Sequence, residues 1–538
     1  MKILVVRPGV EIVEQTLRGP WPSQLAHLDR LYREHAVLFR AFGALQTLAH
    51  SSTIAVGTML KELGRDVEYL DVPFEFGVPL TEEGNEKRHE KIQDYIAKGG
   101  YDVVGISCTS SFECVATQRI AEAAKRAGHD TTVMVGGYQA SSDARSLMEK
   151  IPAIDVIVLS DFEPIAEGLM SAIEGKGEMS DLPNLMYRDD ISICTSQRKH
   201  IPMRSEDLPL YDYSLVTPYI SRYAIFVVEA SRGCPYNCSY CQEKTMRKFY
   251  TVKDAEVAVD ELVSSANYIA QHAHPVTFFY SDPLWGLKPE WVKAFCTLLA
   301  ERREEITASK FGWIIEARVG QFDEEELALM NEAGCMSIGY GVESLSPEIL
   351  KTMKKTEHPQ QYITTVFDTI EKTLTHNIQA VMFFLFGIPG ETPETIQETL
   401  TRMKAFPLEK ENLHIALSLA HPLRGTLMEK QIHDPQFVEE HGLKILDENE
   451  WEKAYIPRLT LLFDPSKTLS ASQLADIYLD LVHGNLGIPA FEKQLEVFRE
   501  VRTILDKEEI SPQELAKWSR IFRQVVSAHF GGHHEVSV

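Results

Sequence analysis

Several features that mark other protein classes are missing from this sequence. Its 538 residues contain no run of about 18 apolar residues, the length that a membrane-spanning helix needs. No tract is biased enough in composition to predict disorder. The first residues, MKILVVRPG, are interrupted too early to form a signal peptide and predict a β-strand instead. With 44% hydrophobic and 25% charged residues, the chain is expected to fold into three or four globular domains.

Positive charge and cysteine are both scarce. The 54 lysines and arginines face 78 aspartates and glutamates, and the resulting net charge of −24 opposes binding to nucleic acid or to an anionic membrane. Eight cysteines in so long a chain do not form a disulfide framework, so a reducing cytoplasmic location is predicted. Five of the eight lie in or beside apolar stretches and are expected to be buried free thiols: Cys108, Cys114, Cys194, Cys296 and Cys335.

The first part of the chain, residues 1–184, alternates apolar strand-like runs with amphipathic helical patterns. This alternation predicts a doubly wound parallel sheet with helices on both faces. The expected strands are residues 2–8, 66–72, 102–108, 131–137 and 155–160, and the expected helices include 52–64, 114–128 and 163–175. Ligands of such sheets bind beyond the carboxyl ends of the strands, where Gly136 and Gly137 lie. Residues 10–50 interrupt the pattern, and their role is not predicted.

A second pattern begins after residues 185–212, a hairpin-like pair and a proline-bearing polar stretch that together predict a linker. Over residues 213–430 a strand and a helix alternate six times, which predicts a partial (β/α)6 barrel with its chemistry at the carboxyl ends of the strands. The expected strands are residues 223–230, 275–282, 311–319, 336–344, 379–388 and 414–422. Residues 431–538 are mostly helical in pattern and predict a small C-terminal helical domain.

One short motif requires a chemical explanation. The stretch SRGCPYNCSYCQEK places Cys234, Cys238 and Cys241 at the spacing C-x3-C-x2-C, in the loop after the first barrel strand. A structural zinc site needs a fourth ligand, and no nearby cysteine or histidine supplies one. Buried thiols without a function are a second alternative. Three thiolates suit an iron–sulfur cluster that leaves one iron open to a small molecule, and the spacing and the position favour this interpretation.

The motif, with Tyr240 before its last cysteine, resembles that of the radical S-adenosylmethionine (radical SAM) superfamily. The resemblance implies a 4Fe-4S cluster that cleaves S-adenosylmethionine to methionine and a 5′-deoxyadenosyl radical, which abstracts hydrogen from carbon. The six-unit barrel agrees with this family, although it is inferred from strand periodicity and independently of the motif.

Other strand ends of the barrel resemble the family less specifically and supply candidate contacts to S-adenosylmethionine. Ser281 and Asp282 end the second strand, Arg318 ends the third, and Glu343 lies in the GYGVES stretch of the fourth. The resemblance also implies that the backbone around Ile388, in FGIPGET, packs against adenine. A single Glu or Arg at a strand end is as often a salt-bridge residue, and GIPG could be an ordinary turn. The order of these features along the barrel favours the binding role.

The region ahead of the barrel resembles the flavodoxin-like domain of cobalamin-binding radical SAM enzymes. The matching stretches are KILVVRP, ISCTSS, MVGGYQASS and IDVIVLSDFEP. Two of them depart from the family's turns: Tyr138-Gln139 stands within a G-G-x-H-x-S turn, and Ser160-Asp161-Phe162-Glu163 replaces a G-E-G-E turn. The candidate cobalamin contacts are Ser107, Thr109, Ser110, Gly136, Gly137, Tyr138, Gln139, Ser141, Ser160 and Glu163. A domain that serves only as a scaffold is the alternative.

The pattern D-x-H-x-x-G, which supplies a histidine ligand to cobalt in other cobalamin-binding proteins, is absent, and His129 lacks its context. We therefore predict that no histidine of this protein ligates cobalt. The resemblance as a whole implies a class B methyltransferase that acts on an unactivated carbon of a small molecule and takes electrons from a flavodoxin or ferredoxin.

The first alternative function is a rearrangement, cyclisation or oxidation by the same cofactors without methyl transfer. A tRNA methylthiotransferase would require three clustered cysteines in the N-terminal domain and a basic RNA-binding tail, which Cys108, Cys114, Cys194 and the negative charge fit poorly. A non-catalytic scaffold would leave the cysteine triplet unused. Contacts to the substrate are expected from residues 10–50 and from the C-terminal helices.

Overall fold

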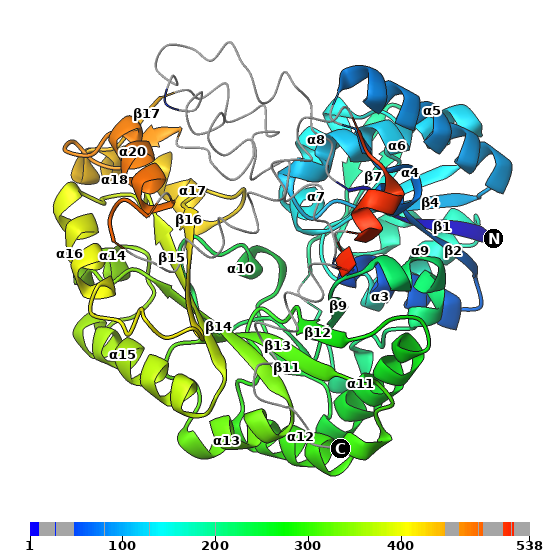
Figure 1. Cartoon of the computed structure of the whole chain (residues 1–538). Coiled ribbons are helices and arrows are strands. Elements are labelled where there is room, and N and C mark those ends of the chain that lie inside the picture. The colour runs from blue at the N-terminus through cyan, green and yellow to red at the C-terminus, as the bar shows by residue number, and fades with distance from the viewer. Residues whose placement is uncertain are drawn as a thin grey trace.

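The computed structural model describes residues 1–9, 27, 48–446, 462–487 and 509–520, with residues 80, 129, 200, 483 and 518 excepted. The predicted insertion at 10–50 therefore lies almost entirely outside the described residues, as do His129 and much of the predicted C-terminal domain. Two α/β units lie side by side, with the short helix α10 (Glu243–Met246) between them (Figure 1).

The N-terminal unit is built on a seven-stranded sheet. Its five parallel strands follow the order β2-β1-β4-β5-β6, which is the flavodoxin order 2-1-3-4-5 when they are numbered along the chain. The topological switch point lies between β1 and β4, at the carboxyl end where such folds bind ligands. The five strands are β1 (Lys2–Arg7), β2 (Asp66–Asp71), β4 (Val103–Ser107), β5 (Thr132–Gly136) and β6 (Val156–Val158). The predicted doubly wound, flavodoxin-like sheet is confirmed.

Helices cover both faces of this sheet because alternate strand residues point to opposite sides. Leu4 and Val6 pack in one hydrophobic cluster with α5 and α6, whereas Ile3 and Val5 pack in another with α3 and α9. Helix α5 was not recognised from the sequence pattern. The helices of the unit are α3 (Ser51–Glu62), α4 (Val72–Phe76), α5 (Glu82–Gly99), α6 (Cys114–Ala127), α7 (Tyr138–Ser142), α8 (Ala144–Lys150) and α9 (Ala166–Ile173).

The sheet extends further along the chain than the sequence indicated. Strands β7 (Leu185–Asp189) and β8 (Ser192–Thr195) form an antiparallel hairpin that joins the sheet beside β6. The first part of the predicted linker at 185–212 therefore belongs to the N-terminal sheet, because its backbone groups complete the hydrogen bonds of β6. The hairpin-like pattern itself was recognised correctly.

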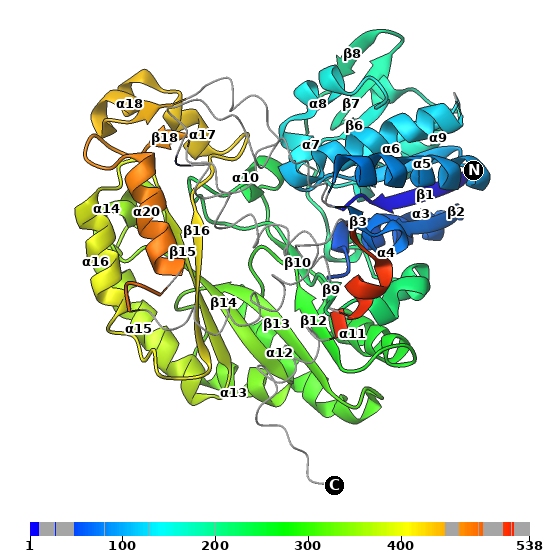
Figure 2. The ribbon, with the colours of Figure 1, turned by 45° about the horizontal axis from the view of Figure 1, so that its top comes forward.

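The second unit is the predicted partial barrel. Its six strands are all parallel and lie in the order of the chain, from β9 to β16. Helices α11 to α16 lie outside the curved sheet (Figure 2). The strands are β9 (Phe226–Val228), β12 (Val276–Tyr280), β13 (Phe311–Arg318), β14 (Cys335–Glu343), β15 (Gln379–Phe386) and β16 (Leu413–Leu419). The helices are α11 (Ala255–Ala270), α12 (Pro289–Glu301), α13 (Glu324–Glu332), α14 (Pro347–Thr352), α15 (Pro359–Thr375) and α16 (Pro393–Met403).

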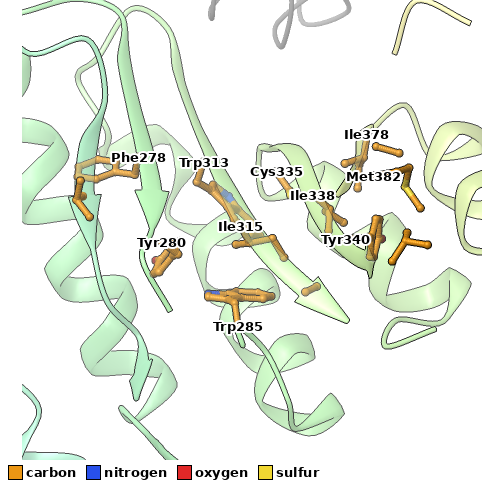
Figure 3. Close-up of a cluster of buried hydrophobic side chains, with 14 of the residues drawn as sticks. Phe278, Tyr280, Trp285, Trp313, Ile315, Cys335, Ile338, Tyr340, Ile378 and Met382 are labelled. Carbon is orange, nitrogen blue, oxygen red and sulfur yellow. The ribbon is translucent and has the colours of Figure 1, made fainter. Parts of the chain in front are cut away.

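Aromatic side chains fill the core beneath the barrel strands (Figure 3). Trp285 and Trp313 are fully buried, with ring centroids 5.1 Å apart, and Tyr280 meets Trp313 edge to face at 6.0 Å. Truncating one such side chain typically costs about 3–5 kcal/mol, so this cluster holds the strand ends in fixed positions.

The described C-terminal segments pack on the two units instead of around a separate core. Leu474 and Tyr478 of α20 (Ala471–Val482) belong to the hydrophobic core of the barrel, and β19 (Glu509–Ile510) pairs with β3 (Val78–Pro79) of the N-terminal unit. The other elements are α17 (Leu427–Ile432), α18 (Pro435–His441), β17 (Lys444–Ile445) and β18 (Phe463–Asp464). Among the described residues, no helix combines the length and the apolar composition needed to cross a membrane.

Candidate active site

The cysteine motif forms the loop between β10 (Ser231–Arg232) and α10, directly after the first barrel strand. Gly233 begins this loop with φ of +83°, and a Cβ there would lie 1.9 Å from the carbonyl oxygen of Phe249. Glycine is therefore required for the loop to close against residue 249. Cys234, Cys238 and Cys241 are all free thiols of intermediate burial at this loop.

The thiols do not converge on a single point. Within the part of the chain that the structure describes, no three His, Cys, Asp or Glu side chains are placed to hold one metal ion. A zinc ion with Zn–S bonds of about 2.3 Å would hold its sulfurs about 3.8 Å apart. The three thiols of this one loop therefore stay the predicted ligands of an iron–sulfur cluster, on the strength of their spacing.

Burial favours the protonated form of two of these thiols, Cys234 and Cys241. It raises the pKa of Cys234, and it raises the pKa of Cys241 to about 12, with the neighbouring cysteines contributing to both shifts. Thiols in this environment keep their protons at neutral pH unless a cation compensates the thiolate charge. The iron of a cluster supplies that compensation, so the chemistry of the three side chains fits the predicted cofactor.

Tyr240 connects the cysteine loop to β14. Its hydroxyl donates to Glu343 Oε1 at 2.8 Å, and the same oxygen lies 3.1 Å from Lys355 Nζ. Lys355 is nine-tenths buried and also contacts the Tyr240 hydroxyl at 3.3 Å. Glu343 has φ of +71° at an irregularity between β14 and β15, which is an uncommon conformation for a residue other than glycine. Lys355 therefore positions a candidate S-adenosylmethionine contact, and the sequence did not reveal it.

Arg318, at the end of β13, also contacts the cysteine loop. Its guanidinium stacks over the Tyr236 ring at 4.0 Å and donates to the carbonyl oxygen of Lys355. Arg318 thus supports the cysteine loop from β13, and its role in binding S-adenosylmethionine stays a prediction.

The two residues predicted at the end of β12 have different environments. Asp282 accepts hydrogen bonds from Ala230 N at 3.0 Å and Ser231 Oγ at 2.5 Å, so it orients the chain that enters the cysteine loop. Burial raises the pKa of Asp282 to about 7, in opposition to those hydrogen bonds. Ser281 Oγ, by contrast, is buried without a hydrogen-bond partner and lines a cavity between the two units.

The FGIPGET segment turns sharply after β15. Ile388 is fully buried, and the contact of its backbone with adenine stays a prediction. Gly387 N donates to Glu391 Oε2 at 2.5 Å, and Gly390 N donates to Pro465 O at 2.8 Å. The turn is thereby tied to its own helix and to the C-terminal region.

A cavity of about 620 Å³ lies at the carboxyl ends of the N-terminal strands and opens toward the barrel. Most of the predicted cobalamin contacts line it: Ser107, Thr109, Gly136, Gly137, Tyr138, Ser160 and Glu163. Ser110, Gln139 and Ser141 do not. The Ser141 hydroxyl donates to Val158 O at 3.1 Å, the Ser110 amide donates to Glu113 Oε2 at 3.1 Å, and Gln139 is buried within α7.

Two features of this cavity are compatible with a polar ligand. Gly137 has φ of +108°, and a Cβ there would lie 2.5 Å from Cys108 O, so only glycine lets these loops approach each other. Glu163 Oε2 and Ser281 Oγ are buried without partners and come to the cavity from opposite units. Unsatisfied polar atoms of this kind are costly unless a ligand or water pairs with them. The donor set and the space fit cobalamin.

His50, which no sequence pattern reveals, lines the same cavity just before α3. His50 Nδ1 contacts Thr53 Oγ1 at 2.6 Å, and Nε2 lies 3.9 Å from Glu113 Oε1. Burial, with a contribution from the charge of Arg7, lowers the pKa of His50 to about 3, so the imidazole is neutral at physiological pH. No motif surrounds His50 in the sequence, and only the tertiary structure brings it to the strand ends.

Comparison with known proteins identifies both units. The family model of the radical SAM superfamily matches residues 228–403, and that of the B12 binding domain matches residues 52–170. The chain is 26% identical to an uncharacterized methyltransferase of Pyrococcus horikoshii, over 62% of this chain and 70% of that protein. It is 24% identical to the anaerobic magnesium-protoporphyrin IX monomethyl ester cyclase of Rubrivivax gelatinosus, over 74% of this chain and 65% of that protein.

A solved structure has the same arrangement of units. The radical S-adenosylmethionine methyltransferase TsrM of Kitasatospora setae, with cobalamin and a [4Fe-4S] cluster bound, superposes with a TM-score of 0.60 at 19% identity, covering 82% of this chain and 80% of that one. This likeness shows the fold. Together with the two family models and the fit of the residues above, it identifies the cofactors as a 4Fe-4S cluster, S-adenosylmethionine and cobalamin.

Proposed function

This chain belongs to the cobalamin-binding radical SAM enzymes, and we propose that it transfers a methyl group to an unactivated carbon of a small molecule. When bound, cobalamin supplies the methyl group, while the cluster and S-adenosylmethionine supply the radical that activates the substrate. The observation that carries the proposal is that one cavity is lined from both units, by Gly137 and Tyr138 on one side and by Ser281 beside the barrel on the other. Methyl transfer requires this shared space, because the methyl donor and the activated carbon must meet.

The residues of this chain contribute orientation and exclusion of water. Gly137 lets its loop approach the backbone of Cys108 at the edge of the cavity, and Ser281 offers a free hydroxyl from the barrel side. No side chain of the cavity is assigned as a general base. The proposed substrate class rests on the match to the radical SAM family, because the cavity of about 620 Å³ is assigned above to cobalamin.

The test uses S-adenosylmethionine that carries a deuterated methyl group. The reconstituted protein is incubated anaerobically with a small-molecule extract, a one-electron reductant and cobalamin, and the products are analysed by mass spectrometry. We expect S-adenosylhomocysteine, deuterated methylcobalamin and one product that has gained the deuterated methyl group. The matched control is Cys238→Ala, which should lose iron and the labelled product while it still binds cobalamin. Equal iron in both proteins would contradict the cluster assignment.

A second candidate function is cyclisation or oxidation without methyl transfer, which the resemblance to the Rubrivivax gelatinosus cyclase favours. The same experiment separates the two. Formation of 5′-deoxyadenosine together with a changed, unlabelled product would support the second function and refute methyl transfer.

We also propose a flavodoxin or ferredoxin as electron donor and the reducing cytoplasm as the location. The support for the donor is the partial exposure of the cysteine loop, where Tyr236 is 39% exposed and the three thiols are only half-buried. The support for the location is that all eight cysteines are free thiols. Reduced flavodoxin should replace a chemical reductant in supporting cleavage of S-adenosylmethionine. If neither reduced flavodoxin nor reduced ferredoxin supports cleavage of S-adenosylmethionine, this part of the proposal is wrong.

A further inference from the structure

Two arginines bracket the cysteine motif in the sequence. Arg232 lies two residues before Cys234, and Arg247 lies six residues after Cys241, at the C-terminal end of α10. Both side chains are largely buried, with 7% and 14% of their surface exposed. A buried guanidinium requires acidic partners, so the position of those partners decides what the two arginines hold together.

One carboxylate is shared by both arginines. Asp161 Oδ1 accepts from Arg232 Nη1 at 3.1 Å and from Arg247 Nε at 2.8 Å. Asp161 lies in the loop after β6, in the N-terminal unit, whereas both arginines belong to the barrel side. Burial tends to raise the pKa of Asp161, but Arg247 and Arg232 outweigh it and hold the pKa below its usual value. The aspartate is therefore ionised and joins the two units.

Further contacts complete this interdomain network. Arg232 also binds Glu163 Oε1 at 2.8 Å and Glu229 Oε2 at 2.9 Å. Arg247 Nη1 donates to the hydroxyl of Tyr138 at 2.7 Å, and Tyr138 in turn donates to Glu243 at the start of α10.

Every loop of the N-terminal unit in this network also lines the shared cavity. Tyr138 follows β5, and Asp161 and Glu163 follow β6, all at the carboxyl ends of the strands. The contacts to Arg232 and Arg247 thus attach the walls of one cofactor site to both ends of the loop that carries the three cysteines.

From this arrangement we infer that Asp161 is a positioning residue, which fixes the cobalamin-binding loops to the cysteine loop and so sets the relative placement of the two cofactors. In the family's G-E-G-E turn, Ser160 and Phe162 of this chain replace the two glycines, whereas Asp161 stands at the position of the first Glu and so keeps the acidic side chain that bridges the two arginines. The inference rests on the two cofactor sites and not on methyl transfer.

The test compares Asp161→Asn with Asp181→Asn, a matched change at an exposed aspartate of the same unit. Each full-length protein is reconstituted with iron, sulfide and cobalamin, and reduced to give the paramagnetic cluster and cob(II)alamin. We measure iron per chain, the dissociation constant of cobalamin, and the distance distribution between the two paramagnetic centres by pulsed electron paramagnetic resonance.

We expect Asp161→Asn to keep its full iron content, to bind cobalamin roughly tenfold more weakly and to show a clearly broader distance distribution than Asp181→Asn. A second variant, Tyr138→Phe, removes only the hydroxyl link and should broaden the distribution less. An unchanged distribution in Asp161→Asn would overturn the inference. Loss of iron together with cobalamin would also overturn it, because it would show a general structural role. Neither result depends on whether a methyl group is transferred.

Discussion

Glu391, which follows the GIPG turn, should make the stability of this protein fall as the pH rises. Its side chain is fully buried, and this burial raises its pKa from 4.5 to about 8, although hydrogen bonds from the backbone of Gly387 and Ile388 oppose the shift. Between these two pH values the folded protein holds a proton that the unfolded chain has released. The free energy of unfolding is therefore highest below the unfolded pKa and decreases as the pH approaches the folded pKa.

The size of the effect follows from the shift. Each pH unit corresponds to about 1.36 kcal/mol, so the full interval is worth about 5 kcal/mol as an upper bound. Glu391→Gln keeps an oxygen to accept from Gly387 N and cannot ionise. We expect the variant to gain on the wild type by up to about 1.4 kcal/mol per pH unit between pH 5 and 8.

The assay is urea unfolding at several pH values, followed by tryptophan fluorescence, to which the buried Trp285, Trp291 and Trp313 of the barrel contribute. Glu394→Gln, three residues further on and exposed, is the matched control and should follow the wild-type pH curve. If Glu391→Gln and the wild type give parallel pH curves, the carboxyl is not held neutral and the reasoning is wrong.

Three further predictions concern the cofactor sites. Lys355→Met should leave Glu343 buried without its cation and so lower the free energy of unfolding by about 3–5 kcal/mol. It should also weaken S-adenosylmethionine binding in equilibrium dialysis, with no change in iron content. An unchanged affinity would show that Lys355 does not contribute to the binding site. Gly137→Ala should abolish cobalamin uptake, because the new Cβ would collide with Cys108 O. Uptake is measured by absorbance after gel filtration, and normal uptake would show that the loop at residue 137 can move away from Cys108. Cob(II)alamin bound to this protein should show no hyperfine splitting from a protein nitrogen in its electron paramagnetic resonance spectrum, and His50→Ala should leave that spectrum unchanged. A splitting from a histidine nitrogen that is present in the wild type and lost in His50→Ala would overturn the prediction.

The fold could be predicted largely because its signals are local. Each parallel strand is buried on both faces and therefore appears as a short apolar run, and each helix between strands carries one apolar face. The hairpin of β7 and β8 was recognised as a pattern but placed in a linker, because its pairing with β6 depends on chain alignment and not on its own residues.

Some residues of the candidate site could likewise be identified from local sequence signals, and others could not. Cys234, Cys238 and Cys241 lie within one loop, so their spacing alone identifies the cluster motif and, through it, the reaction class. Lys355 could not be found from the sequence, because its partner Glu343 is on another element and Tyr240 lies 115 positions away. The Ser141 hydroxyl donates to Val158 O, because a small residue near a strand end can hydrogen-bond inward, and its contact with cobalamin stays a prediction.

The sequence by itself determined the two sheets, the order of these sheets along the chain and the cysteine motif, since periodicity and spacing act over a few residues. Only the tertiary structure decided how the two cofactor sites face each other. Asp161 and Arg232 are separated by 71 positions, and an acidic or basic residue in a sequence does not indicate which opposite charge it will meet. Burial makes that choice, because a charge removed from water is stable only where the fold supplies its partner.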